Sequence, residues 1–358
     1  MENDPAEILK KKRIFVSTKS AGAPGIYAFT RVLRRQGIQI DFWNLSANKY
    51  NFNFDLTLPR TKLKIVNLII RLMYFFYCIL HYDIFHFYSM SCFFNSKFEL
   101  LLLNKCNKYV INTFAGSEAF DIQRSVLEDK QLSAYYEYAR SKPQSYFVNH
   151  KKNVEFTIKH SKEIAINGPW LIDSISRFDA IIPYSRPIPE SKTVASNKSR
   201  ENFIILHAPT NQGIKGTKYI VNTIKHLKAQ GLKIELLLPD QISHEALLAL
   251  IQEADIVIDQ ILMGWYGGFA VEVMARGKPV IAYLKTSYRQ AVDFGNTIPI
   301  INASVRTLGD VLTHFYYHQD ELHELSEPGR EFVKKIHAPE VIAAQYAKLY
   351  EKALIYGK

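Results

Sequence analysis

The chain has 358 residues, of which 47% are hydrophobic and 22% are charged, and its formal net charge is +11 at pH 7. This length is too great for one ordinary hydrophobic core and suits two, and the composition is that of an ordinary globular protein. The three cysteines, Cys78, Cys92 and Cys106, have neither disulfide-framework nor metal-ligand spacing, so we expect buried thiols in a reducing cytoplasm.

The positive charge lies entirely in the first half of the chain. Residues 1–200 have a net charge of +12, whereas residues 201–358 have a net charge of −1. Such asymmetry indicates either a solvated basic surface or an anionic partner, such as an anionic membrane surface bound by the basic N-terminal half. Nucleic acid is not expected, because no recognition motif is present. The first residues, MENDPAEILKKKR, lack the apolar core of a secretory signal.

Apolar runs and helical segments alternate through this first half. Such alternation predicts a parallel, doubly wound sheet, in which ligands bind at the carboxyl ends of the strands. The relevant loops are then Thr18–Gly25, Tyr88–Cys92 and Thr113–Glu118. His81 and His86 flank a buried apolar run and are interpreted as structural. The expected strands are Arg13–Ser17, Ile38–Phe42, Ile84–Tyr88 and Tyr109–Phe114, and the expected helices are Ile26–Arg35, Ile65–Leu80 and Asn153–Ala165.

The longest apolar segment, Ile65–Leu80, is shorter than the roughly 20 residues that span a bilayer. Arg60, Lys64, Asn67 and Arg71 recur at helical spacing and form one polar stripe. Two interpretations stay open. The helix can cover the sheet and keep one solvated edge, or its basic stripe can lie on an anionic membrane.

A linker and a last helix set the expected domain limits. Pro183–Glu201 is rich in proline and serine and reads as a linker, and Pro339–Lys358 has amphipathic helical spacing. We therefore expect an N-terminal domain over residues 1–195, a second domain over 196–336 and a C-terminal helix over 337–358.

Two strand–loop–helix junctions follow the linker. One strand ends at His207, and its loop leads into a helix at Lys215-Gly216-Thr217. A second strand, Asp255–Asp259, is followed by Gly264–Gly268 and a helix that carries Glu272. Helix N-termini present N–H groups and partial positive charge, so both junctions suit a phosphate.

This region resembles the donor-binding domain of GT-B glycosyltransferases, family 4 in particular. Glu272 matches the second Glu of the family's Glu-x7-Glu motif, Gly277, Pro279 and Val280 match the strand after it, and Lys215 matches the family's Lys-Gly donor motif. The resemblance is strong over about residues 203–336 and weaker before them. It implies two Rossmann-like, doubly wound parallel-sheet domains facing a cleft, with the last helix crossing back to the N-terminal domain.

The resemblance also implies roles for individual residues. Lys215 would neutralise the leaving diphosphate and Glu272 would bind the ribose hydroxyls, although a solvated lysine and an acid favoured by the helix dipole are the plainer interpretations. Trp265 and Tyr266 either line the sugar pocket or pack, and His207 is either structural or a ligand. The implied donor-binding residues are Gly22, Gly25, Thr210, Asn211, Gly216, Gly264, Trp265, Tyr266, Gly267, Gly268 and Phe269, and the acceptor-side residues are Ser117 and Glu118.

The chain departs from the family pattern at three places. Gly264 stands where the family has the first Glu, Gln212 and its neighbours offer no Arg, and Ala115 stands where a His is usual. No Asp-x-Asp occurs, which favours a metal-independent mechanism without a cofactor beyond the nucleotide sugar.

Four functional hypotheses result. The first is a retaining hexosyltransferase-type glycosyltransferase that acts on a glycan or lipid-linked acceptor in bacterial surface polysaccharide or glycoconjugate synthesis. It would be cytoplasmic and peripheral at the inner face of the membrane. The others are a sugar-nucleotide epimerase using Glu118 and Asp121, a non-catalytic GT-B partner subunit, and a basic lipid- or polyanion-binding protein.

Overall fold

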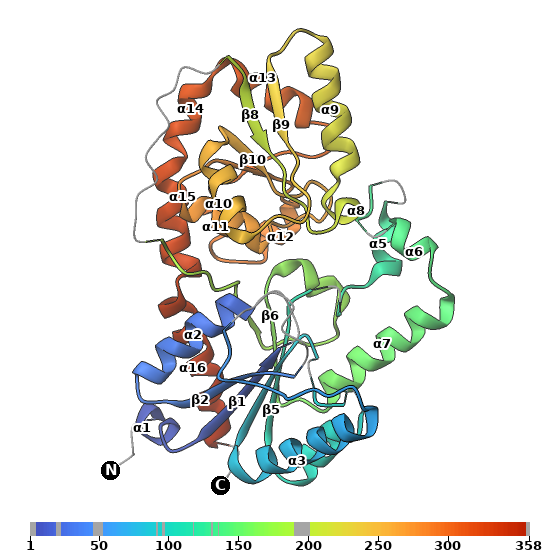
Figure 1. Cartoon of the computed structure of the whole chain (residues 1–358), viewed down its shortest axis with the longest axis vertical. Helices are drawn as coiled ribbons and strands as arrows, with labels where there is room; N and C mark the ends of the chain where they lie inside the picture. The colour runs from blue at the N-terminus through green and yellow to red at the C-terminus, as the bar shows by residue number, and fades with distance from the viewer. Residues whose placement is uncertain are drawn as a thin grey trace. The chain divides into compact units, whose positions relative to one another are not determined.

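The computed structural model describes residues 5–18, 23–45, 53–90, 92–94, 97–116, 118–129, 132–134, 136–189 and 201–355. The chain divides into two compact units (Figure 1). Unit 1 comprises Met1–Asp121, Gln144–Pro187 and Ala338–Lys358, and unit 2 comprises Ile122–Pro143 and Ile188–His337.

Unit 1 contains a seven-stranded parallel sheet in the order β3-β2-β1-β4-β5-β6-β7. Parallel strands are buried on both faces, which explains continuous apolar runs such as that of β4. The strands are β1 (Arg13–Thr18), β2 (Gln39–Asn44), β3 (Leu56–Thr57), β4 (Ile84–Tyr88), β5 (Tyr109–Phe114), β6 (Glu163–Ile166) and β7 (Ala180–Ile181).

Helices cover both faces of this sheet. On one face, α2 (Ala23–Arg35) and α16 (Pro339–Ile355) pack in a core with Ile14 and Val16 of β1. On the other face, α3 (Lys64–His81) and α4 (Lys97–Lys105) pack in a core with Phe15. The remaining helical elements of unit 1 are α1 (Pro5–Leu9), α7 (Gln144–Lys159) and the 3-10 helix Pro169–Ser174.

A buried polar network fastens α16 to the sheet of unit 1. The ring of His86 lies 2.7 Å from the Tyr350 hydroxyl through Nδ1 and 2.7 Å from the Thr113 hydroxyl through Nε2. The Tyr346 hydroxyl lies 3.3 Å from Thr113 Oγ1. Because desolvation disfavours the charged ring, burial lowers the pKa of His86 to about 3. His86 is therefore structural, as expected from the sequence.

Unit 2 contains a five-stranded parallel sheet in the order β12-β11-β10-β8-β9. The strands are β8 (Phe203–Leu206), β9 (Ile234–Leu237), β10 (Ile256–Ile258), β11 (Val280–Ala282) and β12 (Ile301–Asn302). The helices are α5 (Ile122–Glu128), α6 (Tyr136–Arg140), α8 (Gln212–Lys215), α9 (Thr217–Ala229), α10 (His244–Glu253), α11 (Gly268–Ala275), α12 (Thr286–Gln290), α13 (Leu308–Tyr317), α14 (Gln319–Glu324) and α15 (Ser326–Phe332), with short 3-10 and π turns at Gly295–Thr297 and Val333–His337.

Three details differ from the expectations. The helix expected over Asn153–Ala165 is α7, which ends at Lys159, and the residues after it form the short strand β6. Cys106 is exposed rather than buried. The segment Ile122–Pro143, expected in the first domain, belongs to unit 2, where Glu128 lies 3.7 Å from Lys285.

Candidate functional site

The site begins where two neighbouring strands of unit 2 end. β8 and β10 are parallel partners, and His207 and Asp259 follow them at the same edge of the sheet. Both side chains are buried. The His207 ring lies 2.8 Å from the Ile258 carbonyl through Nδ1 and 2.8 Å from Thr217 Oγ1 through Nε2. A carbonyl oxygen only accepts, so Nδ1 donates and Nε2 accepts from the hydroxyl. Burial lowers the pKa of His207.

His207 therefore joins the strand end to the start of α9, which is the structural alternative of the two left open by the sequence. Its two ring nitrogens both have protein partners.

Asp259 joins the two junctions. Its Oδ1 lies 2.6 Å from the Lys215 ammonium, and its Oδ2 accepts a 2.6 Å hydrogen bond from the Gly267 N–H. Lys215 is the last residue of α8, and Gly267 is the N-cap of α11. The carboxylate is fully buried and the lysine side chain is 14% exposed. One acid thus brings the two expected phosphate-binding elements together.

Asp259 was not predicted from the sequence as a functional residue. The available signal was its position, because an acid directly after an apolar strand at the carboxyl edge of a parallel sheet needs a partner when it is buried. The pairing of Lys215 with Asp259 also explains why a lysine is tolerated beside the N-terminus of α9. Its counter-ion is Asp259, so the position of Lys215 alone does not require a phosphate.

Two glycines of the site adopt positive φ. Gly216 has φ 82°, and an added Cβ would lie 2.7 Å from Ile261 Cγ1. Gly264 has φ 71°, and an added Cβ would lie 3.1 Å from Lys285 Cβ and 3.3 Å from the Tyr288 ring. L-residues are strained at positive φ, so the backbone conformation at Gly264 disfavours the Glu that the family has at this position.

Gly267 lies close to the ion pair of Lys215 and Asp259. A Cβ there would lie 3.0 Å from Lys215 Nζ and 3.1 Å from Asp259 Oδ2. A Cβ at this position would require Lys215 or Asp259 to shift by a few tenths of an ångström. This requirement agrees with a glycine that lets polar groups approach the backbone.

Glu272 lies on α11 with basic partners. Its Oε1 is 2.7 Å from His244 Nε2 and 3.4 Å from Arg276 Nη1, and its side chain is 19% exposed. Burial lowers the pKa of Arg276, while the Glu272 charge opposes that shift. His244 begins α10 and was not singled out from the sequence. Because its side chain is 66% exposed, a ligand that reaches Glu272 could displace it.

The aromatic pair Trp265 and Tyr266 is in the core. Each is 2% exposed, their rings stack with centroids 4.8 Å apart, and the Tyr266 hydroxyl lies 3.0 Å from His337 Nε2. Both side chains are therefore packed in the core of unit 2, as the packing alternative expects.

The remaining expected donor residues lie in different surroundings. Thr210 is exposed, and exposed Asn211 caps α8 by accepting a 3.1 Å hydrogen bond from the Ile214 N–H. Gly268 and Phe269 begin α11 and are partly exposed. Gln212 is the exposed first residue of α8.

The expected residues of unit 1 serve their own loops. Glu118 Oε1 accepts hydrogen bonds from the Ala115 and Gly116 N–H groups, at 2.6 and 3.0 Å. A Cβ on Gly25 would collide with the Ser185 carbonyl, so this glycine is explained by a close backbone approach. Gly22 and Ser117 lie outside the described residues.

Comparisons with known proteins define the fold. No family model and no curated protein matches the chain. Solved structures match the chain over nearly its whole length, and together with its two parallel sheets they show that it has the GT-B fold.

One similar structure is a sucrose-phosphate synthase from Thermosynechococcus elongatus, with a TM-score of 0.62, 15% identity, and 96% of this chain and 100% of that chain covered. Another is the lipopolysaccharide outer core galactosyltransferase WaaB in its apo form, with a TM-score of 0.56, 9% identity, and 94% and 99% covered. A third is MnaA of S. aureus with UDP, with a TM-score of 0.53, 10% identity, and 96% and 97% covered.

Proposed function

We propose that the protein is a glycosyltransferase that moves a sugar from a nucleoside-diphosphate sugar to a glycan or lipid-linked acceptor. The GT-B fold extends over nearly the whole chain, and similar structures include a named galactosyltransferase and a protein solved with UDP. The observation that carries the proposal is the Lys215–Asp259–Gly267 group at the carboxyl edge of the unit 2 sheet.

In this proposal, Asp259 is a positioning residue for Lys215. An ammonium has three N–H donors, and the contact with Asp259 uses one of them. The other two can bind the donor diphosphate, and the first N–H groups of α11 lie beside them because Gly267 is its N-cap. Lys215 then stabilises the negative charge that develops on the leaving diphosphate.

Glu272 is proposed to accept hydrogen bonds from the ribose hydroxyls. Its carboxylate lies in the second turn of α11, on the same helix whose N-terminus would bind phosphate. Glu272→Gln should weaken the binding of nucleoside diphosphates and leave free sugar phosphates unaffected, as measured by calorimetric titration. Equal losses for both ligand classes would contradict the ribose contact.

The reaction itself is tested by consumption of the nucleotide sugar. A thermal-shift screen of nucleotide sugars identifies the donor, and incubation with and without glycan or lipid-linked acceptors then tests transfer. Acceptor-dependent consumption supports a transferase, and retention is tested by the anomeric configuration of the product. Consumption without any acceptor would indicate an epimerase instead.

A non-catalytic GT-B subunit is the second candidate. It is favoured by the positive φ of Gly264, which makes the family's sugar-binding acid unfavourable at this position. Nucleotide binding without consumption of any donor would support this candidate.

The membrane proposal rests on α3. The orientation of this helix differs from the expectation that its polar stripe lies on a solvated or membrane-facing edge. Asn67 bonds to the Thr61 backbone, and Arg71 donates to the carbonyls of Leu45 and Phe93. Arg71 therefore faces the protein, whereas Asn67 is held by the exposed segment that precedes the helix. Phe75 and Cys78, nearby on the helix, are fully buried.

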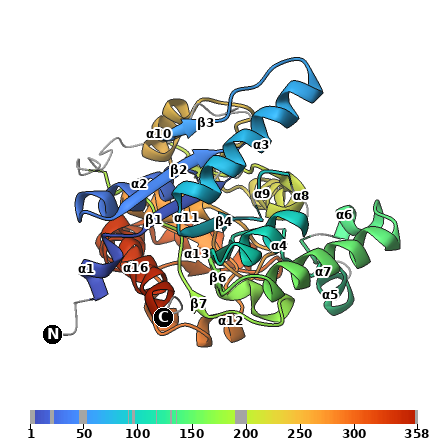
Figure 2. The ribbon, with the colours of Figure 1, turned by 90° about the horizontal axis from the view of Figure 1, so that it is seen from below.

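The outward face of α3 is apolar. Its solvent-facing residues include Leu80 at 80% exposure, and α4 of the same face of unit 1 adds Phe98 and Leu101. Figures 1 and 2 both place α3 on the outer side of the sheet. The other exposed apolar residues of the α3 face are Ile65, Leu68, Ile69, Met73, Phe76 and Tyr77.

Among the described residues, α3 is the one helix that is long and apolar enough to cross a bilayer by length and composition, and 17% of the helix is buried. Its packing on the sheet and the bonds of Arg71 favour a helix lying in the interface rather than across it. Exposed Arg60, Lys62 and Lys64 at its N-terminal end would bind anionic headgroups, each contributing about 1 kcal/mol.

Sedimentation with anionic and neutral liposomes tests the membrane proposal. Wild-type protein should co-sediment with anionic liposomes at low salt, whereas Met73→Ser combined with Phe76→Ser should remain in the supernatant. Leu127→Ser, at a 76% exposed leucine of α5, is the matched control and should bind like wild type. Recovery of the wild-type protein and of all variants in the supernatant would contradict the proposal. It would also be contradicted if the wild-type protein were a dimer and the α3 substitutions abolished that dimer, because the apolar face would then bind a second copy of the chain.

A further inference from the structure

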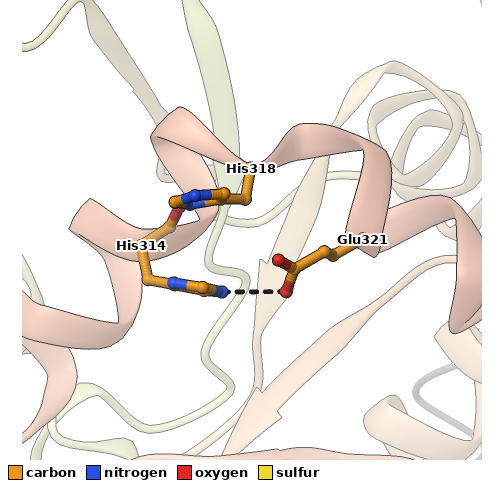
Figure 3. Close-up of side chains that lie close together, drawn as sticks. All are labelled: His314, His318 and Glu321. Carbon is orange, nitrogen blue, oxygen red and sulfur yellow. Dashed lines mark hydrogen bonds and ion pairs between the residues drawn. The ribbon is translucent and has the colours of Figure 1, made fainter.

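A second polar cluster lies at the corner between α13 and α14. His314 is in the last turn of α13, His318 is the residue between the two helices, and Glu321 is in the first turn of α14. Figure 3 shows the two imidazole rings one above the other, with Glu321 facing His314. None of the three residues belongs to the proposed donor site.

The three side chains converge closely. His314 Nε2 lies 2.8 Å from Glu321 Oε2, and the two rings are nearly parallel with centroids 4.5 Å apart. One ligand atom from each residue lies within 4.8 Å of the other two. The spacing of four residues places both imidazoles on one helical face.

The hydrogen bond of His318 fixes its tautomer. Its Nδ1 lies 2.8 Å from the carbonyl oxygen of His314. A carbonyl oxygen only accepts, so Nδ1 carries the hydrogen and the Nε2 of the neutral ring carries the lone pair. Metal-bound histidines are oriented by the same kind of bond from the other ring nitrogen to a carbonyl.

We propose that His314, His318 and Glu321 bind a divalent transition-metal ion, Zn²⁺ in particular. Zinc binds imidazole nitrogen and carboxylate oxygen at about 2.0–2.2 Å, which requires ligand atoms about 3.3 Å apart. Rotation of these partly exposed side chains can close the difference, since the His314 and Glu321 side chains are 47% and 45% exposed. The Nε2 hydrogen of His314 moves to Nδ1 as the ring changes tautomer, and water fills the fourth position.

The donor set selects the class of ion. Two imidazoles and one carboxylate suit zinc, nickel, cobalt and copper, whereas magnesium and calcium prefer oxygen ligands throughout. A bound ion would cross-link α13 to α14 around the corner at His318. Because only the folded corner holds the three ligands together, zinc should raise the thermal unfolding midpoint of the protein.

The test is calorimetric titration of the untagged full chain with ZnCl₂ and with MgCl₂. We expect one zinc ion per chain that magnesium does not replace, and an unfolding midpoint that rises with zinc. His318→Ala and Glu321→Gln should each weaken zinc binding at least about 10-fold, a loss that even outer partners of metal ligands cause. His323→Ala changes an exposed histidine of the same helix outside the cluster and should bind zinc like wild type.

X-ray absorption of the zinc complex provides a second readout, with two imidazole ligands expected. Absence of saturable zinc binding would overturn the proposal. Binding that survives both His318→Ala and Glu321→Gln would also overturn it, because the ion would then lie elsewhere.

Discussion

Lys215 and Asp259 form a buried pair, so substitutions at one affect the other. Removing the lysine alone leaves the fully buried Asp259 carboxylate with only the Gly267 N–H as a partner. Lys215→Met should therefore destabilise the protein by about 3 kcal/mol, the lower end of the cost of breaking a buried pair. Urea unfolding measures this loss of stability. The same loss would hide any separate effect of the substitution on nucleotide binding.

The double variant Lys215→Met/Asp259→Asn separates stability from binding. It replaces the ion pair by neutral side chains of similar size and should recover most of the stability. Its nucleoside-diphosphate affinity should still be about 1.5–3 kcal/mol weaker than that of Asp259→Asn, which keeps the ammonium. Equal calorimetric affinities for the two variants would exclude Lys215 from the phosphate site.

Gly264 is the residue at which restoring the family motif should fail. Gly264→Glu would place a side chain at φ 71° against Lys285 and Tyr288, at a cost of about 1–3 kcal/mol for the backbone alone. We expect reduced stability without tighter sugar-nucleotide binding.

Gly231 supplies a matched control for the Gly264 prediction. It also has positive φ, at 96°, but no atom within 4 Å of its added Cβ. Thermal unfolding should show a larger loss for Gly264→Ala than for Gly231→Ala. A stable Gly264→Glu with raised donor affinity would refute this account.

At the scale of elements, the attachment of α16 to the unit 1 sheet should depend on pH. His86 has a folded pKa of about 3, below the ordinary value of about 6.5 expected when unfolded. Between about pH 3 and 6.5, His86 is therefore protonated in the unfolded chain but neutral in the folded protein. Stability is full above about pH 6.5 and falls as the pH drops towards 3, by up to about 1.4 kcal/mol per pH unit.

Urea unfolding at pH 7, 6 and 5 measures this dependence. The lowered pKa of His207 acts in the same direction in unit 2, so both units should lose stability in acid. His86→Gln removes one titrating group and should flatten the pH dependence, although its stability at pH 7 falls. A slope unchanged by His86→Gln would show that the ring does not control this transition.

At the scale of the whole molecule, donor binding should not require a metal. The proposed contacts to the diphosphate are the Lys215 ammonium and helix N–H groups, which take the place of a divalent cation. Calorimetric titration with the nucleotide in saturating chelator tests this, and the affinity should be unchanged. His318→Ala serves as the control, because it removes the proposed zinc site without touching the donor site. Loss of binding in chelator that magnesium or manganese restores would contradict the prediction.

The sequence determined the elements and the class of fold. Strands such as Ile84–Tyr88 and Tyr109–Phe114 were predicted with their observed bounds, because strands buried on both faces leave continuous apolar runs. The alternation of strands and helices predicted parallel sheets, and the GT-B fold is confirmed by the similar structures. The short strand β6 was missed, since four residues carry too little periodic signal.

Only the tertiary structure decided which side chains meet. Asp259 and Lys215 are 44 residues apart, and their pairing depends on two strands ending at one edge of a sheet. The inward turn of Arg71 likewise depends on acceptors supplied by Leu45 and Phe93. Periodicity gives the spacing of a helical face, but the partner that the face meets is set by long-range packing. For that reason the sequence predicted one polar stripe from Arg60 to Arg71, whereas in the structure Arg71 turns inward and Arg60 and Lys64 stay exposed.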